Sequence, residues 1–412
     1  MAKKKKKRRV LSYLFSYDMN LIVAVLFLIV FGLVMIYSAS YYTASMSDAF
    51  NHDPTFLLMS QLKYSILGIV VMLFVANVDY HFWKHFAMLG FLASIVLILL
   101  LKVPGLGVTV KGATRWIRIP GLGQFQVAEP VKVAMILFSA TLIGNYSGRL
   151  DNMKNFITVL IPTAVVSVLI LKISNNMSTA TIVLGISFLM AFMVYPKYWP
   201  FVLMGGAGVT GVGALIFYLK QKLASGDVGS GNGGFRGARI LAWLDPYSYE
   251  SDKAYQSLQA LYAIGSGGLF GKGLGNSIQK LGRIPEPYND MIFPIICEEL
   301  GVFGAGLIIL MFIYLLYQLY SVAQEAEDTF GRLLAIGVFS HVALQVVLNL
   351  MVVTSLFPTT GVTLPFFSYG GTASVFLLFE IGMVLNVEKQ SRFKKEKNCG
   401  RQEWDERTYK SN

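Results

Sequence analysis

One short segment of the chain places acidic side chains where an apolar helix is expected to begin. The segment reads RIPEPYNDMIFPIICEELG and carries Asp290, Glu298 and Glu299. Ionisable side chains inside a bilayer cost several kcal/mol each, so they are candidates for function. Asp290 follows PEPYN, where an external loop would re-enter the membrane. A carboxylate there can be partly shielded, still meet a substrate from water or lipid, and act as a general base.

The alternative for Asp290 is purely structural, because Asp is a preferred N-cap residue of helices. Glu298 and Glu299 lie about two and a half turns deeper in the same expected helix. We expect these two residues to brace the site by bonding loop amides or cationic side chains. The segment thus offers one candidate base and two candidate supports.

A second group of ionisable residues opens another expected span, in the sequence QVAEPVKV. Glu129 and Lys132 are three positions apart, so they share one helical face. Pro130 suits the first turn of a helix, which places Glu129 where the helix dipole favours a carboxylate. The pair can be a structural ion pair that lets both groups enter the membrane, part of a site, or both.

Cationic residues in the expected loops could complete such a site. Arg115, Arg118, Arg239 and Lys272 are the candidates, and clustered cations beside a bilayer suit a phosphate or pyrophosphate lipid headgroup. Two classes of function fit this set. One is a transferase that uses a lipid-linked pyrophosphate donor, and the other is a transporter or flippase that moves such a lipid.

A polar stripe follows one later span, where His341, Gln345 and Asn349 recur every fourth residue. Polar stripes in membrane bundles more often hydrogen-bond neighbouring helices than carry chemistry. We therefore expect a packing role for these three residues. Glu380, alone in the last expected span, receives no assignment.

The composition identifies the framework that must position these residues. The chain has 412 residues, of which 55% are hydrophobic and 14% charged, whereas about a quarter of a soluble protein is charged. A membrane-crossing helix needs about 20 mostly apolar residues. We predict an all-α polytopic membrane protein with about ten transmembrane helices, near residues 19–39, 63–78, 84–102, 127–145, 155–172, 177–195, 199–219, 290–321, 331–355 and 364–387.

The charge distribution predicts how these spans cross the membrane. Part of the net charge of +12 lies in two tails, residues 1–18 with KKKKKRR and residues 389–412 with KQSRFKKEK. Basic flanks beside apolar spans favour the cytoplasmic side and make a nucleic-acid partner a poor interpretation. Both tails are then cytoplasmic, and the large loop 220–289 between spans seven and eight is extracytoplasmic. The loop 103–126 is external as well, although its cations would prefer the cytoplasm unless an anionic ligand holds them outside.

Four stretches resemble the SEDS family (shape, elongation, division and sporulation), the FtsW/RodA/SpoVE-type peptidoglycan polymerases. They are KGATRWIRI, QVAEPVKV, the series from AYQSLQALYAIGSGGLFGKGLGNSIQK into IPEPYNDMIFPIICEELG, and NLMVVTSLFPTTGVTLPFFSYGG. The resemblance implies a transmembrane glycosyltransferase domain over residues 19–388 in the bacterial cytoplasmic membrane. It implies that the catalytic aspartate aligns with Asp290 and that a carboxylate–lysine pair aligns with Glu129 and Lys132. It also implies a class B penicillin-binding protein (a transpeptidase) as partner, beside other division or elongation machinery.

The expected activity is therefore polymerisation of lipid II into β-1,4-linked glycan strands, with release of undecaprenyl pyrophosphate. The charged tails favour the division type (FtsW), while an elongation or a sporulation role stays open. A lipid II flippase and a non-enzymatic scaffold of the division machinery are the alternatives. The glycine-rich GSGGLFGKGLG segment is expected to let backbone approach the sugar or phosphate and to move on substrate binding.

The chain departs from the family pattern at three places, and the departures bear on metal use. Asn176 stands where an aspartate is usual, the residues before Glu129 lack the usual Pro-Ser, and Tyr288-Asn289 replaces His-Thr before Asp290. Loss of the acid at Asn176 weakens any cation site built from two carboxylates. We predict no metal-ligand residues and no required cofactor, with assistance by Mg or Mn as the open alternative.

Overall fold

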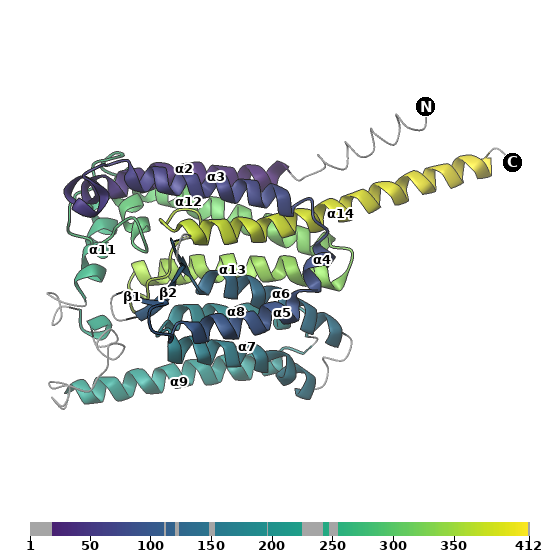
Figure 1. Ribbon diagram of the computed structural model, residues 1–412, viewed down its shortest axis with the longest axis horizontal. Helices are drawn as coiled ribbons and strands as arrows, with labels where there is room; N and C mark the ends of the chain where they lie inside the picture. The colour runs from purple at the N-terminus through teal and green to yellow at the C-terminus, as the bar shows by residue number, and fades with distance from the viewer. Residues whose placement is uncertain are drawn as a thin grey trace.

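Long helices lie side by side in one bundle, with a small group of strands and one short helix at one end (Figure 1). This computed structural model describes residues 19–110, 113–119, 123–147, 153–195, 197–224, 242–246 and 254–410. Within these residues, each of the ten predicted spans has a matching helix. Their bounds are α2 (Met19–Met46), α3 (Phe56–Val75), α5 (Ala87–Leu100), α6 (Ala128–Tyr146), α7 (Met153–Ile173), α8 (Met177–Phe192), α9 (Trp199–Ala224), α12 (Ile292–Glu325), α13 (Thr329–Val353) and α14 (Gly371–Lys410).

Six of these helices are long and apolar enough to cross a membrane, namely α2, α3, α7, α12, α13 and residues 371–394 of α14. Helices α5 and α8 are apolar but shorter. The outer face of α5 shows what surrounds the bundle, because Met88, Leu89, Leu92 and Val96 are each more than half exposed. Contiguous apolar surface of this kind needs a non-aqueous neighbour. The protein is a multi-pass membrane protein, as predicted.

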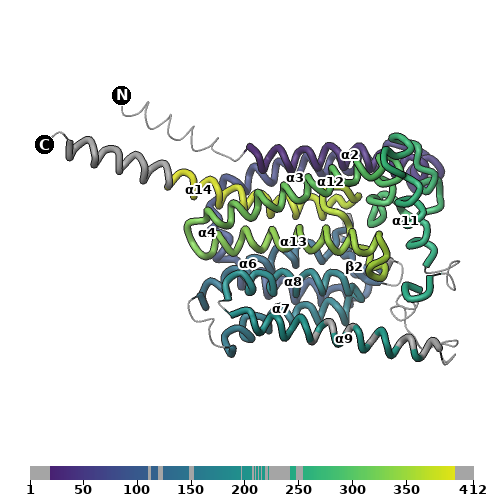
Figure 2. The backbone as a smooth tube through the Cα atoms, turned by 180° about the vertical axis from the view of Figure 1, so that it is seen from behind, coloured from purple at the N-terminus to yellow at the C-terminus, as the bar shows by residue number. Residues whose placement is uncertain are grey.

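The start of α2 and the C-terminal part of α14 lie at the same end of the bundle, which we call the tail end (Figures 1 and 2). The strands and helix α11 (Tyr255–Ser266) lie at the opposite end, which we call the sheet end. Short helices α4 (Tyr80–Lys84) and η1 (Asp48–Phe50) complete the described set. An even number of crossings is consistent with this placement of the start of α2 and the C-terminal part of α14, while the predicted cytoplasmic location of the tails stays a prediction.

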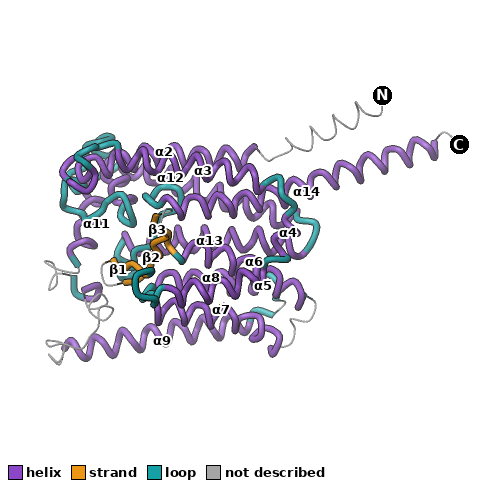
Figure 3. Tube along the Cα trace, viewed as in Figure 1, coloured by secondary structure: helices purple, strands orange, loops and turns teal. Residues whose placement is uncertain are grey.

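The predicted helical membrane fold is confirmed, and a small three-stranded antiparallel sheet that was not predicted adds to it (Figure 3). Strands β1 (Gly107–Val110), β2 (Ala113–Ile119) and β3 (Gly123–Gln126) pair in the order β1-β2-β3. Successive side chains of β2 point to opposite faces of the sheet, so Ala113 and Ile117 are buried while Arg118 is exposed. Period-two alternation with β-branched residues favours a strand. The prediction considered long apolar runs and did not include these short strands.

Helix α13 is the central element, because it packs against α6, α8, α12 and α14. Its polar stripe of His341, Gln345 and Asn349 is buried. Side chains on one face of such a helix reach several neighbours at once, which makes α13 the frame for polar contacts between them.

Helix α12 is not the continuous span that the sequence predicted, because the helix breaks at Gly301, where φ is 67° and ψ is −168°. The glycine-rich segment 267–275 fills the break. Lys272 N donates to Glu298 O and Gly273 N to Glu299 O, both at 2.9 Å, while Val302 N donates to Gly268 O at 3.0 Å. The loop thereby satisfies backbone groups that the break removes from the helix ladder.

Close approach explains the glycines of this loop. A Cβ on Gly267 would lie 2.0 Å from the carbonyl oxygen of Cys297, and one on Gly271 would lie 2.2 Å from that of Glu299. We expected these glycines to let the backbone approach a sugar or phosphate. In the structure they let the loop pack closely against the backbone of α12.

The two glutamates before the break hold the same loop, as predicted. Glu298 accepts hydrogen bonds from Ser277 Oγ, from the amides of residues 278 and 279, and from Lys272 Nζ at 2.6 Å. Glu299 accepts from Lys280 Nζ at 2.7 Å and from Ser38 Oγ of α2. Both carboxylates are fully buried, so these partners supply what water would supply outside.

We predict that Gly271→Ala destabilises the protein more than Gly275→Ala. Both glycines have positive φ, but a Cβ on Gly275 meets nothing within 4 Å. Strain alone costs about 1–3 kcal/mol, and the clash at Gly271 adds about 1–3 kcal/mol of overpacking. Thermal unfolding of both variants in detergent micelles checks this, and equal midpoints would contradict the close-packed loop.

We also predict that Lys280→Met lowers stability by about 3–5 kcal/mol, because it leaves a buried carboxylate without its cation. Lys272→Met should cost less, since Glu298 keeps four other donors. Adding Glu299→Gln to Lys280→Met should restore most of the loss. If the two lysine variants unfold at the same temperature, the ion pair of Glu299 is not the main support of the loop.

Candidate active site

Asp290 lies in the turn before α12, at the sheet end, and it is not the helix cap. The N-cap residue is Met291, and no side chain caps this helix end. The backbone of the turn is held from two sides. Asn349 Nδ2 donates to Asp290 O at 2.9 Å, and Tyr369 N donates to Tyr288 O at 2.8 Å. The structural alternative for Asp290 as the helix cap therefore fails, and its side chain is half-buried.

Arg115 of β2 lies beside this carboxylate. A Cβ built on Gly361 would lie 3.6 Å from Arg115 Nη1 and 3.7 Å from Asp290 Oδ2, so both groups face the same point. Gly361 has φ of +77° and belongs to the loop between α13 and α14, so its backbone lies against both groups. A cation and a carboxylate from distant parts of the chain thus meet at one spot on the sheet end.

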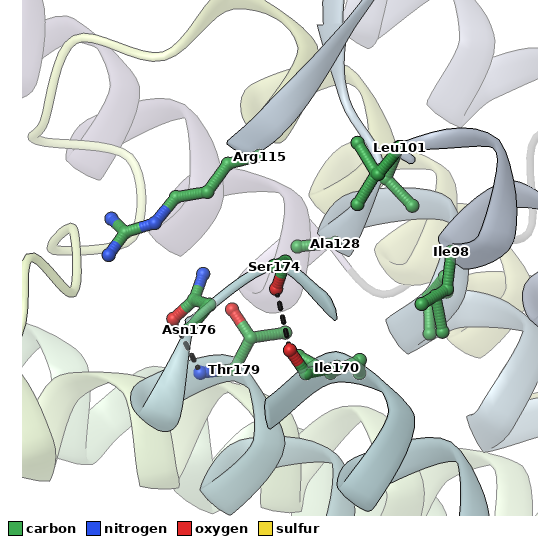
Figure 4. A pocket seen from close by; sticks show the side chains of 10 residues that line it. Ile98, Leu101, Arg115, Ala128, Ile170, Ser174, Asn176 and Thr179 are labelled. Carbon is green, nitrogen blue, oxygen red and sulfur yellow. Dashed lines mark hydrogen bonds between the residues drawn. The ribbon is translucent and has the colours of Figure 1, made fainter. Parts of the chain in front are cut away.

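A pocket extends from Arg115 toward α8 (Figure 4). Asn176, the buried N-cap of α8, lines this pocket and accepts a hydrogen bond from Thr179 N at 3.1 Å. Figure 4 shows its amide nitrogen on the side that faces Arg115. Because the oxygen of Asn176 is used by the cap, the group offered toward Arg115 is a hydrogen-bond donor. Two donors on one pocket wall favour an anion over a cation.

The predicted pair of Glu129 and Lys132 forms near the start of α6. Lys132 Nζ lies 3.0 Å from Glu129 Oε2, and both side chains are more than nine-tenths buried. Glu129 also lines a second pocket, together with His341, Gln345, Thr363 and other residues of the α13–α14 loop and α14. The pair is therefore a structural ion pair and a wall of a cavity at the same time.

The stripe on α13 bonds neighbouring elements, as predicted, and it reaches both halves of the site. Gln345 Oε1 accepts from Lys132 Nζ at 3.3 Å, and Asn349 Nδ2 donates to Val362 O at 2.8 Å as well as to Asp290 O. His341 Nδ1 lies 2.7 Å from Glu380 Oε2 of α14. The sequence showed the four-residue spacing but gave no sign of which neighbours the stripe would meet.

The other predicted cations are placed apart from this spot. Arg118 lies on the exposed face of β2, opposite to Arg115. Lys272 pairs with Glu298 at 2.6 Å, with its side chain 30% exposed. Arg239 lies outside the described residues. The predictions that these three bind substrate stay predictions, and Arg115 is the one loop cation of the four that the described residues bring to Asp290.

Tyr288 is another titratable residue of the turn. Burial, together with the nearby Glu286 carboxylate, raises the pKa of the Tyr288 phenol to about 12. A phenol with that pKa keeps its proton near neutral pH and cannot act as a base there. Among the described residues, no three His, Cys, Asp or Glu side chains are grouped so as to hold a metal ion.

Comparison with known proteins gives this site its family context. The sequence model of the FtsW/RodA/SpoVE family, described as "Cell cycle protein", matches residues 19–393. A probable peptidoglycan glycosyltransferase FtsW of Geobacter sp. (strain M18) is 37% identical over 380 residues, which is 92% of this chain and 98% of that protein. Stage V sporulation protein E of Bacillus subtilis (strain 168) is 34% identical over 380 residues, with the same two shares.

Solved structures agree with the fold. The rod shape determining protein RodA of Thermus thermophilus aligns with a TM-score of 0.62 and 25% identity, covering 92% of this chain and 98% of that chain. A chain of the structure described as "Structural coordination of polymerization and crosslinking by a peptidoglycan synthase complex" aligns with a TM-score of 0.70 and 24% identity, covering 92% and 99%. The resemblance inferred from the motifs is confirmed: this chain belongs to the FtsW/RodA/SpoVE family.

Proposed function

We propose that this protein is a peptidoglycan glycosyltransferase that polymerises lipid II into β-1,4-linked glycan strands and releases undecaprenyl pyrophosphate. Membership of the family and relatives named as peptidoglycan glycosyltransferases support this activity. The observation that carries the proposed site is the meeting of Asp290 and Arg115 beside Gly361. A base and a cation that face the same point are what transfer of a sugar from a pyrophosphate donor requires.

Asp290 acts as the general base in this proposal. It takes the proton from the acceptor sugar's 4-hydroxyl while that oxygen attacks the anomeric carbon of the donor. The bond from that carbon to the pyrophosphate breaks, and the α-linked donor gives a β-1,4 bond by inversion. A single base suffices because the leaving group is already a stable anion, whereas glycoside hydrolysis also needs an acid.

The cations balance the charge that develops on the departing pyrophosphate. Arg115 is closest to Asp290 and can form paired hydrogen bonds with phosphate oxygens. Lys132 supplies a second positive charge from the buried end of the site, with Glu129 fixing its position. Positive groups that are already in place within a low-dielectric cavity stabilise such charge more than they would in water.

We assign the sheet end to the outer face of the cytoplasmic membrane and both tails to the cytoplasm. The basic tails and the even number of crossings support this orientation. The fold shared with a chain of a complex that couples polymerization and crosslinking supports a class B penicillin-binding protein as partner. That partner would supply the transpeptidase.

We predict that Asp290→Asn lowers lipid II polymerisation by about 100-fold or more, the usual contribution of a general base. The assay uses the purified protein with its partner and labelled lipid II. Asp48→Asn is the control, because Asp48 is an almost fully exposed carboxylate in the loop after α2. Normal strand formation by Asp290→Asn would remove Asp290 as the base. Lipid II translocation without new glycosidic bonds would favour the flippase instead.

We predict that polymerisation continues at near the wild-type rate when a chelator removes divalent ions. Mg²⁺ and Mn²⁺ bind best to several oxygen ligands, whereas Arg115 lies beside Asp290 and Asn176 lines the pocket that extends from Arg115. The assay compares wild type with and without chelator and then restores Mg²⁺ or Mn²⁺. A rate that falls with chelator and returns with metal would contradict this donor-rich site.

A further inference from the structure

A continuous chain of contacts joins α14 to the lysine of the site. Glu380 Oε2 lies 2.7 Å from His341 Nδ1, His341 Nε2 lies 2.9 Å from Gln345 Oε1, and Gln345 Oε1 lies 3.3 Å from Lys132 Nζ. All four side chains are more than nine-tenths buried. The proposed mechanism gives His341 and Glu380 no task.

The orientation of the Gln345 amide is fixed by its partners. Its Nε2 donates to Thr363 O at 3.0 Å and to Thr363 Oγ1 at 3.2 Å. A reversed amide would turn its oxygen toward the carbonyl of Thr363 and its nitrogen toward the ammonium of Lys132. Both contacts would be repulsive, so the oxygen faces Lys132 and His341.

This orientation determines the proton on His341. Nε2 of His341 faces an acceptor, Gln345 Oε1, and must therefore carry a hydrogen. On the other side of the ring, Nδ1 and Glu380 Oε2 are close enough to share a hydrogen bond, which needs one proton between them. Whether that proton sits on the ring or on the carboxyl, the pair is neutral overall and Nε2 keeps its hydrogen.

A neutral pair is the arrangement that a membrane interior favours. Glu380 is fully buried, and its Oε1 has no hydrogen-bond partner among the described residues. An isolated carboxylate there would be costly. Glu380 is therefore stable in this position only together with His341. The pair shares one proton and keeps the imidazole in the form that carries a hydrogen on Nε2.

We propose that His341 and Glu380 are positioning residues for Lys132. The locked Nε2–H holds the oxygen of Gln345 in place, and that oxygen, with Glu129, fixes the ammonium of Lys132 from two sides. The proposal rests on the proposed function, since it assumes that Lys132 offsets pyrophosphate charge. The same stripe holds the backbone of Asp290 through Asn349, so α13 sets the distance between the base and the cation.

The test compares variants of the pair in the lipid II polymerisation assay. His341→Leu with Glu380→Leu removes both partners at once and leaves no unpaired buried charge, so the protein should fold. We expect kcat to fall about 10- to 100-fold, with KM changed less, because the negative charge that Lys132 offsets increases as the leaving group departs. Glu380→Gln should retain near wild-type kcat, since its amide can donate to Nδ1 and preserve the tautomer.

Two controls separate positioning from packing. Ser340→Ala changes the neighbouring buried residue of α13, whose hydroxyl has no partner in the described residues, and should leave kcat unchanged. In a Gln345→Leu background, the double variant should cause no further loss, because its effect passes through Gln345. Wild-type kcat in the double variant, an equal loss in the Gln345→Leu background, or an equal loss for Ser340→Ala would overturn the proposal.

A readout independent of activity keeps this proposal distinct from the proposed function. Nitrogen-15 NMR of histidine-labelled protein in lipid bilayers should show one imidazole with a protonated, hydrogen-bonded Nε2 that disappears in the double variant. A bare Nε2 on that histidine would overturn the positioning role even in an active enzyme. If wild type makes no glycan, the proposed function fails, and the NMR result still decides whether the chain of contacts to Gln345 exists.

Discussion

The structure depends on the rule that a charge taken out of water must meet a partner inside the protein. Glu129 meets Lys132, Glu299 meets Lys280, Glu298 meets Lys272, and His341 meets Glu380. In two of these pairs the partners come from a helix and a loop, and in another from two different helices. Three of the four pairs therefore join separate elements as well as neutralising a charge, whereas Glu129 and Lys132 pair within α6.

The same rule applies to the backbone. The break of α12 at Gly301 frees carbonyl and amide groups that lipid could not satisfy, and the glycine-rich segment supplies their partners. This contact anchors the chain just before it turns back toward Asp290. The backbone of the turn itself accepts a hydrogen bond from the Asn349 side chain at Asp290 and one from the Tyr369 amide at Tyr288. The position of Asp290 is thus fixed without a capping hydrogen bond from its carboxylate.

Much of this architecture follows from the sequence. The remaining parts could not be predicted from it, for physical reasons. Apolar runs predict the ten helices, since burial in lipid needs little more than length and composition. The bracing by Glu298 and Glu299 follows from charge at membrane depth. The break at Gly301 and the sheet at 107–126 were missed, because both depend on contacts with distant segments. The meeting of Arg115, Asp290 and Gly361, which are far apart along the chain, likewise needs the folded structure.

The central claim is that Asp290 and Arg115 act on one sugar–pyrophosphate bond at the outer end of the bundle. A structure of the protein with its partner and a non-reactive lipid II analogue tests it most directly. The account predicts the acceptor 4-hydroxyl within hydrogen-bond reach of Asp290, about 2.6–3.2 Å, and the donor pyrophosphate against Arg115. A donor bound at the tail end, or a pyrophosphate seated away from Arg115 with Asp290 facing no sugar, would contradict it.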